Sequence, residues 1–311
     1  MYIGVQTKGI IPEKSIENGI AAIKKAGFDR IDFNLDCFLK NTDLYNGQVN
    51  KFFDKDIDEL IAHFLRYREA MEKHGIKASQ MHAPYPVRVA GRGKQNEYMM
   101  GNVIPKSLII AEVLQVPWVV IHPFKMQYIM QYENGKQTER KENIEYFKML
   151  IPILKQCKVG VCFENLYEGL GQRLVEGVCA DPEEAIWYID TLNEYAGEEL
   201  FGFCLDTGHL QLVKRDLYEF ITKLGKRLKV LHLHENDTIG DLHQMPYTFG
   251  KNENEGQDWN GIYRALKEIE FDGTLSFETF PCMNSFPKGM NEAVLKTIYS
   301  IGDYMRNQIT K

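Results

Sequence analysis

Short apolar runs alternate with longer amphipathic stretches along the chain, which predicts strands and helices in alternation. The runs at 2–7, 30–34, 76–82, 118–122, 159–164, 201–206, 229–234 and 274–278 have the length and apolar character of buried strands. The stretches at about 15–26, 54–74, 97–115, 141–157, 216–224, 259–270 and 291–306, and one that begins at 181–182, predict helices. Eight strands, each followed by a helix, predict an α/β fold, the (β/α)8 barrel.

Single residues locate the ends of several helices. Gly27 and Gly75 follow the first two, where a glycine commonly ends a helix in a left-handed conformation. Asp181 before Pro182 is typical of a capping residue followed by the first helical turn. Since no low-complexity segment or linker interrupts the alternation, we expect residues 1–311 to form one barrel domain.

Six of the predicted strands reach a residue that can bind a metal ion. These residues are His82, His122, Glu164, Asp206, His232 and Glu278, at successive spacings of 40, 42, 42, 26 and 46 residues. Because the carboxyl ends of barrel strands lie on one face, their side chains should form a ring there. Side chains alternate along a strand, so Cys162 and Cys204 should also point inward.

Carboxylates and imidazoles that converge in this way would be costly to bury unless a cation lay among them. Glu164, Asp206, His232 and Glu278 offer a mixed oxygen and nitrogen set. Such a set suits a divalent ion, Mn²⁺ or Zn²⁺ first, and Co²⁺ or Mg²⁺ as well. His209 follows one of these strands, His234 ends another, and Asp241 and His243 form a further Asp-x-His pair. These side chains could supply further metal or substrate ligands on the same face.

Charge and composition limit the classes of molecule that the protein is expected to bind. The net charge of -6, from 37 basic and 43 acidic residues, disfavours nucleic acid, whose binding usually needs a basic surface. No stretch of eighteen apolar residues could span a bilayer, and no leader precedes the first strand, so we expect a cytoplasmic protein that does not bind membranes. The six cysteines are scattered without a Cys-x-x-Cys pair and should be reduced. The oligomeric state is left open, a homo-oligomer included.

Several strings carry a resemblance to a known family. They are Gln80-Met-His-Ala-Pro-Tyr85, Val119-Val-Ile-His-Pro123, Cys162-Phe-Glu-Asn-Leu166, Cys204-Leu-Asp-Thr-Gly-His209, His232-Leu-His-Glu-Asn-Asp237, Asp241-Leu-His243 and Leu275-Ser-Phe-Glu278. With these, nearly the whole chain resembles the xylose isomerase-like barrels, which include sugar isomerases, sugar epimerases and endonuclease IV enzymes. The fold hosts several chemistries, so function has to be argued from the site.

The resemblance to ketose 3-epimerases implies a metal-dependent sugar or sugar phosphate isomerase or epimerase. It implies that Glu164, Asp206, His232 and Glu278 hold one ion, and that proton transfer runs through a metal-stabilised enediolate. Glu164 and Glu278 would be the acid and base, and His209 would steady a substrate oxygen. Leu170 and Thr238 stand where those enzymes have a glutamate and an arginine that grip the sugar. The chain should therefore not be an orthodox ketose 3-epimerase.

The resemblance to endonuclease IV implies an alternative, a zinc phosphodiesterase that acts on abasic DNA. Nine ligands of three zinc ions match in order. They are His82, His122, Glu164, Asp206, His209, His232, Asp241, His243 and Glu278. The acidic charge balance and the lack of a basic run speak against DNA, because phosphate contacts supply most DNA affinity. We therefore favour the sugar enzyme, and rank a sugar-binding barrel without catalysis last because every core ligand is present.

Two further groups are candidates for substrate contacts. Arg88, Arg92 and Lys94, on the glycine-containing loop after the third strand, could bind a phosphate or carboxylate, although a solvated loop fits the same sequence equally well. Aromatic side chains just past strand ends could stack on a sugar ring. These are Phe124, Tyr128, Tyr132 and Tyr167.

Overall fold

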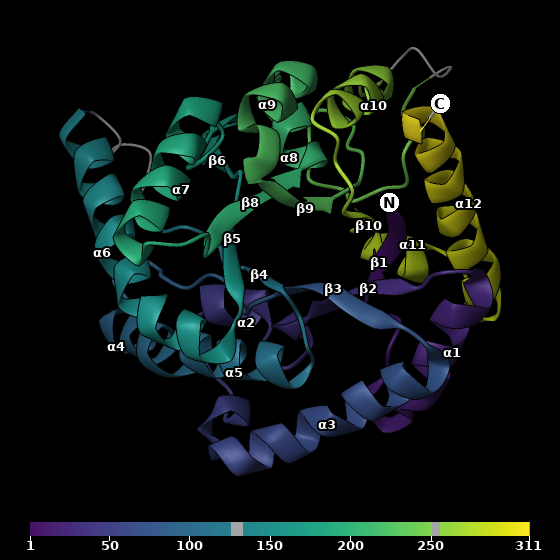
Figure 1. Cartoon of the computed structure of the whole chain (residues 1–311), viewed down its shortest axis with the longest axis horizontal. Helices are drawn as coiled ribbons and strands as arrows, with labels where there is room; N and C mark the ends of the chain where they lie inside the picture. The colour runs from purple at the N-terminus through teal and green to yellow at the C-terminus, as the bar shows by residue number, and fades with distance from the viewer. Residues whose placement is uncertain (126–132, 251–255, 311) are drawn as a thin grey trace.

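The computed structural model describes residues 1–125, 133–250 and 256–310, in which eight parallel strands form a barrel. The strands are β1 (Tyr2–Gln6), β2 (Arg30–Asn34), β3 (Lys77–His82), β4 (Trp118–Val120), β5 (Gly160–Glu164), β8 (Phe201–Asp206), β9 (Leu228–His232) and β10 (Thr274–Phe277). They pair in the order β10-β1-β2-β3-β4-β5-β8-β9. Leu233 joins the two end strands, because its N–H donates to Ser276 and its carbonyl accepts from the Glu278 N–H. The predicted (β/α)8 barrel is confirmed, and Figure 1 looks into the ring of strands.

Helices surround the barrel. They are α1 (Ile16–Ala26), α2 (Asn41–Tyr45), α3 (Ile57–His74), α4 (Gly93–Tyr98), α5 (Ile104–Val113), α6 (Glu133–Cys157), α7 (Pro182–Ala196), α8 (Thr207–Leu212), α9 (Leu217–Leu224), α10 (Trp259–Glu268), α11 (Phe280–Ser285) and α12 (Asn291–Thr310). Gly27 and Gly75 end α1 and α3 in left-handed conformations, and Asp181 caps α7, all as predicted. None of the described helices is both long and apolar enough to cross a membrane.

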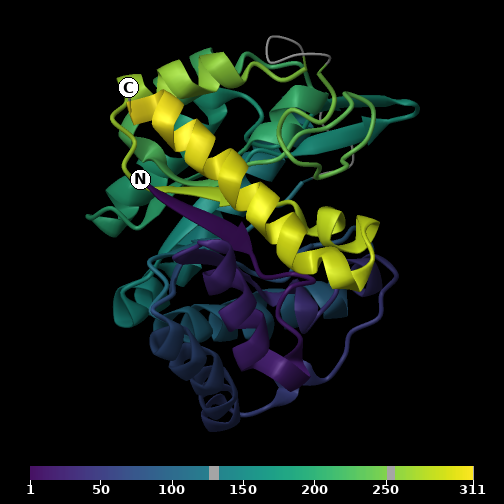
Figure 2. The same cartoon turned by 90° about the vertical axis from the view of Figure 1, so that its right-hand side faces the viewer.

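Three features of the carboxyl face were not predicted. β6 (Tyr167–Leu170) and β7 (Arg173–Glu176) form an antiparallel hairpin directly after β5. Figure 2 shows this hairpin projecting beyond the barrel. Helix α8 follows β8 without a loop, and α6 begins at Glu133, earlier than the predicted residue 141. These additions enlarge the wall around the strand ends.

The barrel interior contains a small apolar layer apart from the main core. Val120, Cys162, Cys204 and Val230 pack together inside the ring. Each lies two residues before a strand-end residue, so the layer underlies the predicted metal ligands. The inward orientation predicted for Cys162 and Cys204 is thereby confirmed, and the interior is packed between the two ends of the barrel.

Candidate active site at the carboxyl ends of the strands

A cavity of about 180 Å³ opens at the carboxyl ends of the strands. Its lining consists of Asn41, Tyr45, His82, Tyr85, His122, Lys125, Glu164, Leu166, Tyr167, His209, Asp241, His243 and Glu278. Seven of the candidate metal or substrate ligands singled out from the sequence, and the candidate aromatic residue Tyr167, are among them. Asp206 and His232 are fully buried beside the cavity. The strand-end ring therefore exists as one site.

The four predicted ligands of a single ion lie together. Glu164, Asp206, His232 and Glu278 each offer an atom, and these four atoms lie within 4.8 Å of one another. His232 Nδ1 lies 3.4 Å from Glu164 Oε1 and 3.2 Å from Glu278 Oε2. All four residues are buried. Three carboxylates and an imidazole at such separations are a donor set that suits a hard or borderline divalent ion.

Two further groups flank this set. His122 Nε2 lies 2.9 Å from Glu164 Oε2 and 3.1 Å from His82 Nε2, so Glu164 is shared between two groups. On another side, Asp241 Oδ2 lies 3.4 Å from His209 Nε2 and 3.2 Å from His243 Nε2. Each group could hold a cation of its own.

Buried polar residues position the four-residue set from outside. Asp32 Oδ2 lies 3.0 Å from His232 Nε2, on the side of the ring opposite the glutamates. His234 Nε2 lies 2.9 and 3.0 Å from the two oxygens of Asp206. Gln6 donates from Nε2 to Glu278 Oε1 over 2.5 Å. Such outer contacts fix the orientation of ligands, so His234 lies where an outer-shell residue would lie.

Local backbone chemistry explains the Leu-Asp-Thr-Gly-His string. Asp206 ends β8 and also caps α8, since its side chain accepts a hydrogen bond of 2.7 Å from the His209 N–H. This cap turns the chain so that the His209 ring returns to the cavity, with Nδ1 3.5 Å from Glu164 Oε1. Gly208 is required because a Cβ there would lie 2.0 Å from the His234 ring. The string therefore contains Asp206, which ends a strand and caps a helix, and His209, a second residue of the site.

Asn165 was missed by sequence reasoning, although it lies in a quoted string. Its side chain bonds both backbone groups of Asp206, accepting from N–H at 2.9 Å and donating to the carbonyl at 2.8 Å. The His209 Nδ1 lies 2.9 Å from the Asn165 carbonyl. Asn165 therefore ties the ends of β5 and β8 together.

The imidazoles and carboxylates of the site shift one another's pKa values. Burial alone would lower the pKa of His209, but Asp206 and Asp241 outweigh it and raise this pKa well above 6.5. Burial would raise the pKa of Glu164, but His122 and His232 hold it well below its usual range. Of the described residues that line the cavity, only Lys125 carries a permanent positive charge, and its Nζ lies 3.5 Å from Glu168. The positive charge that faces the carboxylates therefore comes from protonated imidazoles such as that of His209, and a bound cation would take the place of these protons.

The metal-free protein should lose stability as the pH rises. Against the effect of burial, Glu278 and Asp241 raise the pKa of His243 to about 9 from 6.5. Between these pH values the folded state holds a proton that the unfolded state releases, so the contribution is complete below 6.5 and lost through about 9. We expect the urea midpoint of chelator-treated protein to fall across this window, and to fall less in His243→Gln. A midpoint that stays level or rises in the wild type would contradict the shift.

The predicted anion loop lies outside the cavity lining. Arg88 is paired with Glu142 of α6, and its guanidinium lies 5.7 Å from the centre of the Phe124 ring. Arg92 donates to the Tyr45 carbonyl at 3.4 Å, and Lys94 is exposed. Lys125, which sequence reasoning did not single out, lines the cavity instead.

The aromatic residues predicted to stack on a sugar ring also differ in their position relative to the cavity. Tyr167 lines the cavity, with its ring 5.1 Å from that of His209. Phe124 is buried and packs on Tyr146. Tyr128 and Tyr132 lie outside the described residues. Tyr85, whose ring lies 4.5 Å from that of His122, adds a second aromatic wall.

Comparisons with known proteins agree with this architecture. A family model described as xylose isomerase-like TIM barrel matches residues 20–297. A D-psicose 3-epimerase of Enterocloster bolteae is 29% identical over 150 residues, which are 47% of this chain and 42% of that protein. A solved D-tagatose 3-epimerase-like protein has a TM-score of 0.71 at 16% identity, with 100% of this chain and 98% of that chain covered. The IolI protein, solved with a bound zinc atom, has a TM-score of 0.63 at 17% identity, with 100% and 98% covered.

Proposed function

The chain belongs to the xylose isomerase-like TIM barrel family, and on that premise we propose that it is a divalent-metal-dependent isomerase or epimerase of a sugar or sugar phosphate. One observation carries the proposal. Glu164, Asp206, His232 and Glu278 converge at the carboxyl end of the barrel, where barrels of this kind hold their active sites. The epimerases among the similar proteins support the substrate class.

The buried side chains fit a divalent ion. Glu164, Asp206, His232 and Glu278 would hold it, because their donor atoms are close and their outer sides are already occupied by Gln6, Asp32 and His234. Mn²⁺ and Zn²⁺ match the mixed oxygen and nitrogen donors, and the zinc atom of the IolI protein supports this class of ion. When bound, the ion would supply Lewis-acid polarisation of a carbonyl and its neighbouring hydroxyl.

Two glutamates would move the protons. Glu164 ends β5 and Glu278 follows β10, and β8 and β9 separate these strands in the ring. Their carboxylates therefore approach a substrate from different directions. One glutamate would remove a proton beside the polarised carbonyl, and the other would return one to the opposite face or to the adjacent carbon. His209, which lines the same cavity, would donate a hydrogen bond to a substrate oxygen.

The residues that line the cavity indicate which chemical groups a substrate could carry. Leu170 is exposed in the β6/β7 hairpin and Thr238 is exposed after β9, so neither lines the cavity. Besides the candidate metal ligands, the polar groups of the residues that do line it are the Asn41 amide, the Tyr45, Tyr85 and Tyr167 hydroxyls and the Lys125 amine. These would hydrogen-bond sugar hydroxyls, and Lys125 could pair with a phosphate.

A substrate panel tests this function. Purified protein is stripped with chelator, reloaded with Mn²⁺ or Zn²⁺, and incubated with free and phosphorylated ketoses and aldoses. Carbon-13 NMR then follows each sugar. Appearance of an epimer or isomer that needs the added ion supports the proposal. No conversion across the panel, while abasic DNA is nicked by the same preparation, would reject it.

A specific observation favours a second candidate function. The groups His82, His122, Glu164 and His209, Asp241, His243 flank the four-residue set, so the site could hold more than one ion. Several ions together would favour attack of a hydroxide on a phosphodiester, as in an endonuclease IV-like zinc enzyme. The net charge of -6 and the small cavity of about 180 Å³ favour the sugar enzyme.

The variant His122→Ala separates these two candidates. If the protein is a single-metal isomerase, the variant should keep its ion and bind the sugar more weakly, because His122 lines the cavity without belonging to the four-residue set. If it is a nuclease, the variant should lose an ion together with abasic-site nicking. Ion content by mass spectrometry and nicking of an abasic oligonucleotide, each in wild type and variant, give the answer.

A further inference from the structure

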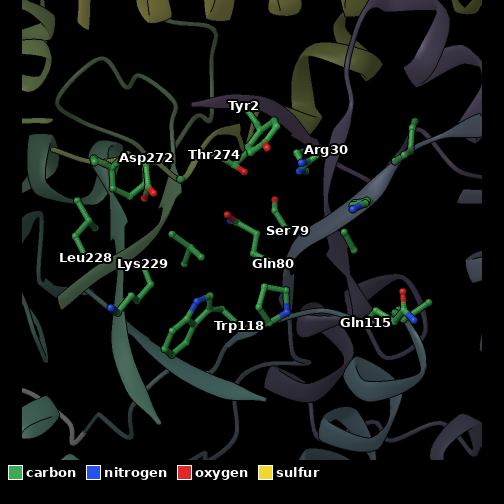
Figure 3. Close-up of a pocket in the computed structure, with 18 of the residues that line it drawn as sticks. Tyr2, Arg30, Ser79, Gln80, Gln115, Trp118, Leu228, Lys229, Asp272 and Thr274 are labelled. Carbon is green, nitrogen blue, oxygen red and sulfur yellow. The ribbon is translucent and has the colours of Figure 1, made fainter. Parts of the chain in front are cut away.

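A second and larger cavity, of about 850 Å³, lies at the amino ends of the strands. Residues at the first or second position of six strands line it. They are Tyr2, Arg30, Lys77, Trp118, Lys229 and Thr274, and all but Lys77 are labelled in Figure 3. The apolar layer of Val120, Cys162, Cys204 and Val230 lies between this cavity and the strand-end site. The two cavities are therefore distinct.

Two glycines leave room for neighbouring side chains at this end of the barrel. Gly160 is the first residue of β5 and Gly202 the second residue of β8, and added Cβ atoms there would lie 2.1 Å from the Trp118 ring and 2.4 Å from the Lys229 stem, respectively. These glycines let both side chains lie across the strands. Apolar residues supply much of the remaining wall. They are Met71, Ile76, Leu114, Leu228, Val230, Ile269 and Phe271.

Arg30 offers free donors to this cavity. Its guanidinium lies 3.6 Å from the centre of the Tyr2 ring, and 16% of its side chain is exposed. Its hydrogen bond to a described residue runs from Nη1 to the Asp29 carbonyl, so Nε and Nη2 remain without a partner in the described part of the chain. A guanidinium held against a ring in this way suits a carboxylate, sulfonate or phosphate group.

The rim carries acidic residues as well. Glu72 is paired with Arg68 at 2.8 Å, and Glu270 lies 3.6 Å from Lys226. Asp272 is exposed at the rim. Glu72 and Glu270 thus have basic partners of their own, and an acid beside Arg30 is Asp29, whose Oδ2 lies 3.9 Å from Arg30 Nη1 and leaves Nε and Nη2 without a partner among the described residues. Lys229 is itself paired with Glu199 at 2.7 Å.

Gln80 adds a fully buried acceptor to the same cavity. Its Nε2 donates to Asp32 Oδ2 at 3.1 Å and to the Leu231 carbonyl at 3.0 Å, which fixes the orientation of the amide. Its Oε1 is buried and has no hydrogen-bond partner among the described residues. A buried acceptor without a partner is costly, and a ligand with an N–H or O–H group would satisfy it.

We propose that the amino-end cavity binds a small organic anion with a planar apolar body and an N–H or O–H donor. The acidic group would bind Arg30, the body would lie between the Tyr2 and Trp118 walls, and the donor would reach Gln80. The volume of about 850 Å³ is that of a small-molecule site, and the lining mixes apolar residues with polar and charged ones, which suits a ligand that has both an apolar body and polar groups.

Two fluorescent probes test this site. 8-Anilinonaphthalene-1-sulfonate carries a sulfonate, an N–H and an aromatic body, and N-phenyl-1-naphthylamine has the same body and N–H without the charge. We expect saturable binding of the sulfonate to the wild type at one site per chain. In Arg30→Gln the Kd of the sulfonate should rise about tenfold, the loss of a charge-assisted hydrogen bond, while that of the uncharged probe stays the same. In Gln80→Leu both affinities should fall.

Matched controls keep the test decisive. Arg66→Gln removes an exposed arginine of α3 outside the cavity and should leave both affinities unchanged. Melting temperatures of all variants check the fold. If Gln80→Leu does not fold, Arg30→Gln still decides, because Arg30 is partly exposed. Absence of binding to the wild type, or equal affinity of the sulfonate for wild type and Arg30→Gln, would overturn the proposal.

Discussion

At saturating Mn²⁺, the variant Glu278→Gln should turn over the sugar substrate about 10³-fold more slowly than the wild type. The amide has nearly the shape of the carboxylate and can still accept a hydrogen bond, but it cannot take up or return a proton. Gln6, which donates to Glu278 Oε1, would still hold the amide in place. Steady-state kinetics by polarimetry or coupled assay would measure kcat and KM separately. The loss should appear in kcat.

The control for this experiment is the same substitution at a glutamate outside the site. Glu292, whose side chain is 63% exposed and paired with Lys25, is a suitable control. Glu292→Gln should keep the activity of the wild type. Turnover by Glu278→Gln within tenfold of the wild type, with its metal bound, would remove Glu278 from proton transfer.

Two variants should lower the Mn²⁺ affinity by different amounts. One removes the His232 ring, and the other removes the charge of the carboxylate behind it. His232→Gln removes the imidazole whose Nδ1 faces Glu164 and Glu278, and should abolish tight Mn²⁺ binding. Asp32→Asn keeps the imidazole and removes the charge 3.0 Å from its Nε2. Loss of such an outer partner should weaken binding roughly 10- to 100-fold.

Isothermal titration of Mn²⁺ into the stripped proteins measures both effects. Asp29→Asn, at a half-buried position directly before β2, is the matched control for Asp32→Asn and should bind Mn²⁺ as the wild type does. Equal Mn²⁺ affinity of His232→Gln and the wild type would show that His232 is no ligand. An unchanged affinity in Asp32→Asn would remove Asp32 from the outer shell.

The fold was predictable because every strand of the barrel leaves its own local signal. An apolar run that stops at a polar residue, followed by an amphipathic stretch, needs no knowledge of distant contacts to be recognised. The gathering of Glu164, Asp206, His232 and Glu278 then follows from the geometry of the barrel, since all four end parallel strands. Their separations within 4.8 Å agree with that inference.

The outer position of His234 follows from its place two residues after His232, but the contacts of Gln6 and Asp32 could not be predicted because they depend on strand order across the closed ring. Gln6 meets Glu278 only because β1 pairs with β10, the first strand with the last. Asp32 reaches His232 across the interior, between strands that are not neighbours. No local pattern distinguishes these polar residues from others at strand ends.

The β6/β7 hairpin did have a signal that was overlooked. Two short runs flank Gly171 and Gln172, and Gly171 adopts a positive φ of 61°. A glycine between two such runs is typical of a tight hairpin turn. The runs are only four residues each and half exposed, so their apolar content is too low to stand out beside the buried strands.

Deuterium exchange into the substrate tests the central claim, proton transfer by a metal-loaded strand-end site, most directly. The protein is incubated in deuterated water with a sugar that it converts, once reloaded with Mn²⁺ and once stripped with chelator, and the product is examined by mass spectrometry and proton NMR. We predict one deuterium at the reacting carbon with Mn²⁺, and none without it or in Glu278→Gln. Conversion without deuterium at that carbon, or equal incorporation by the stripped protein, would contradict the account.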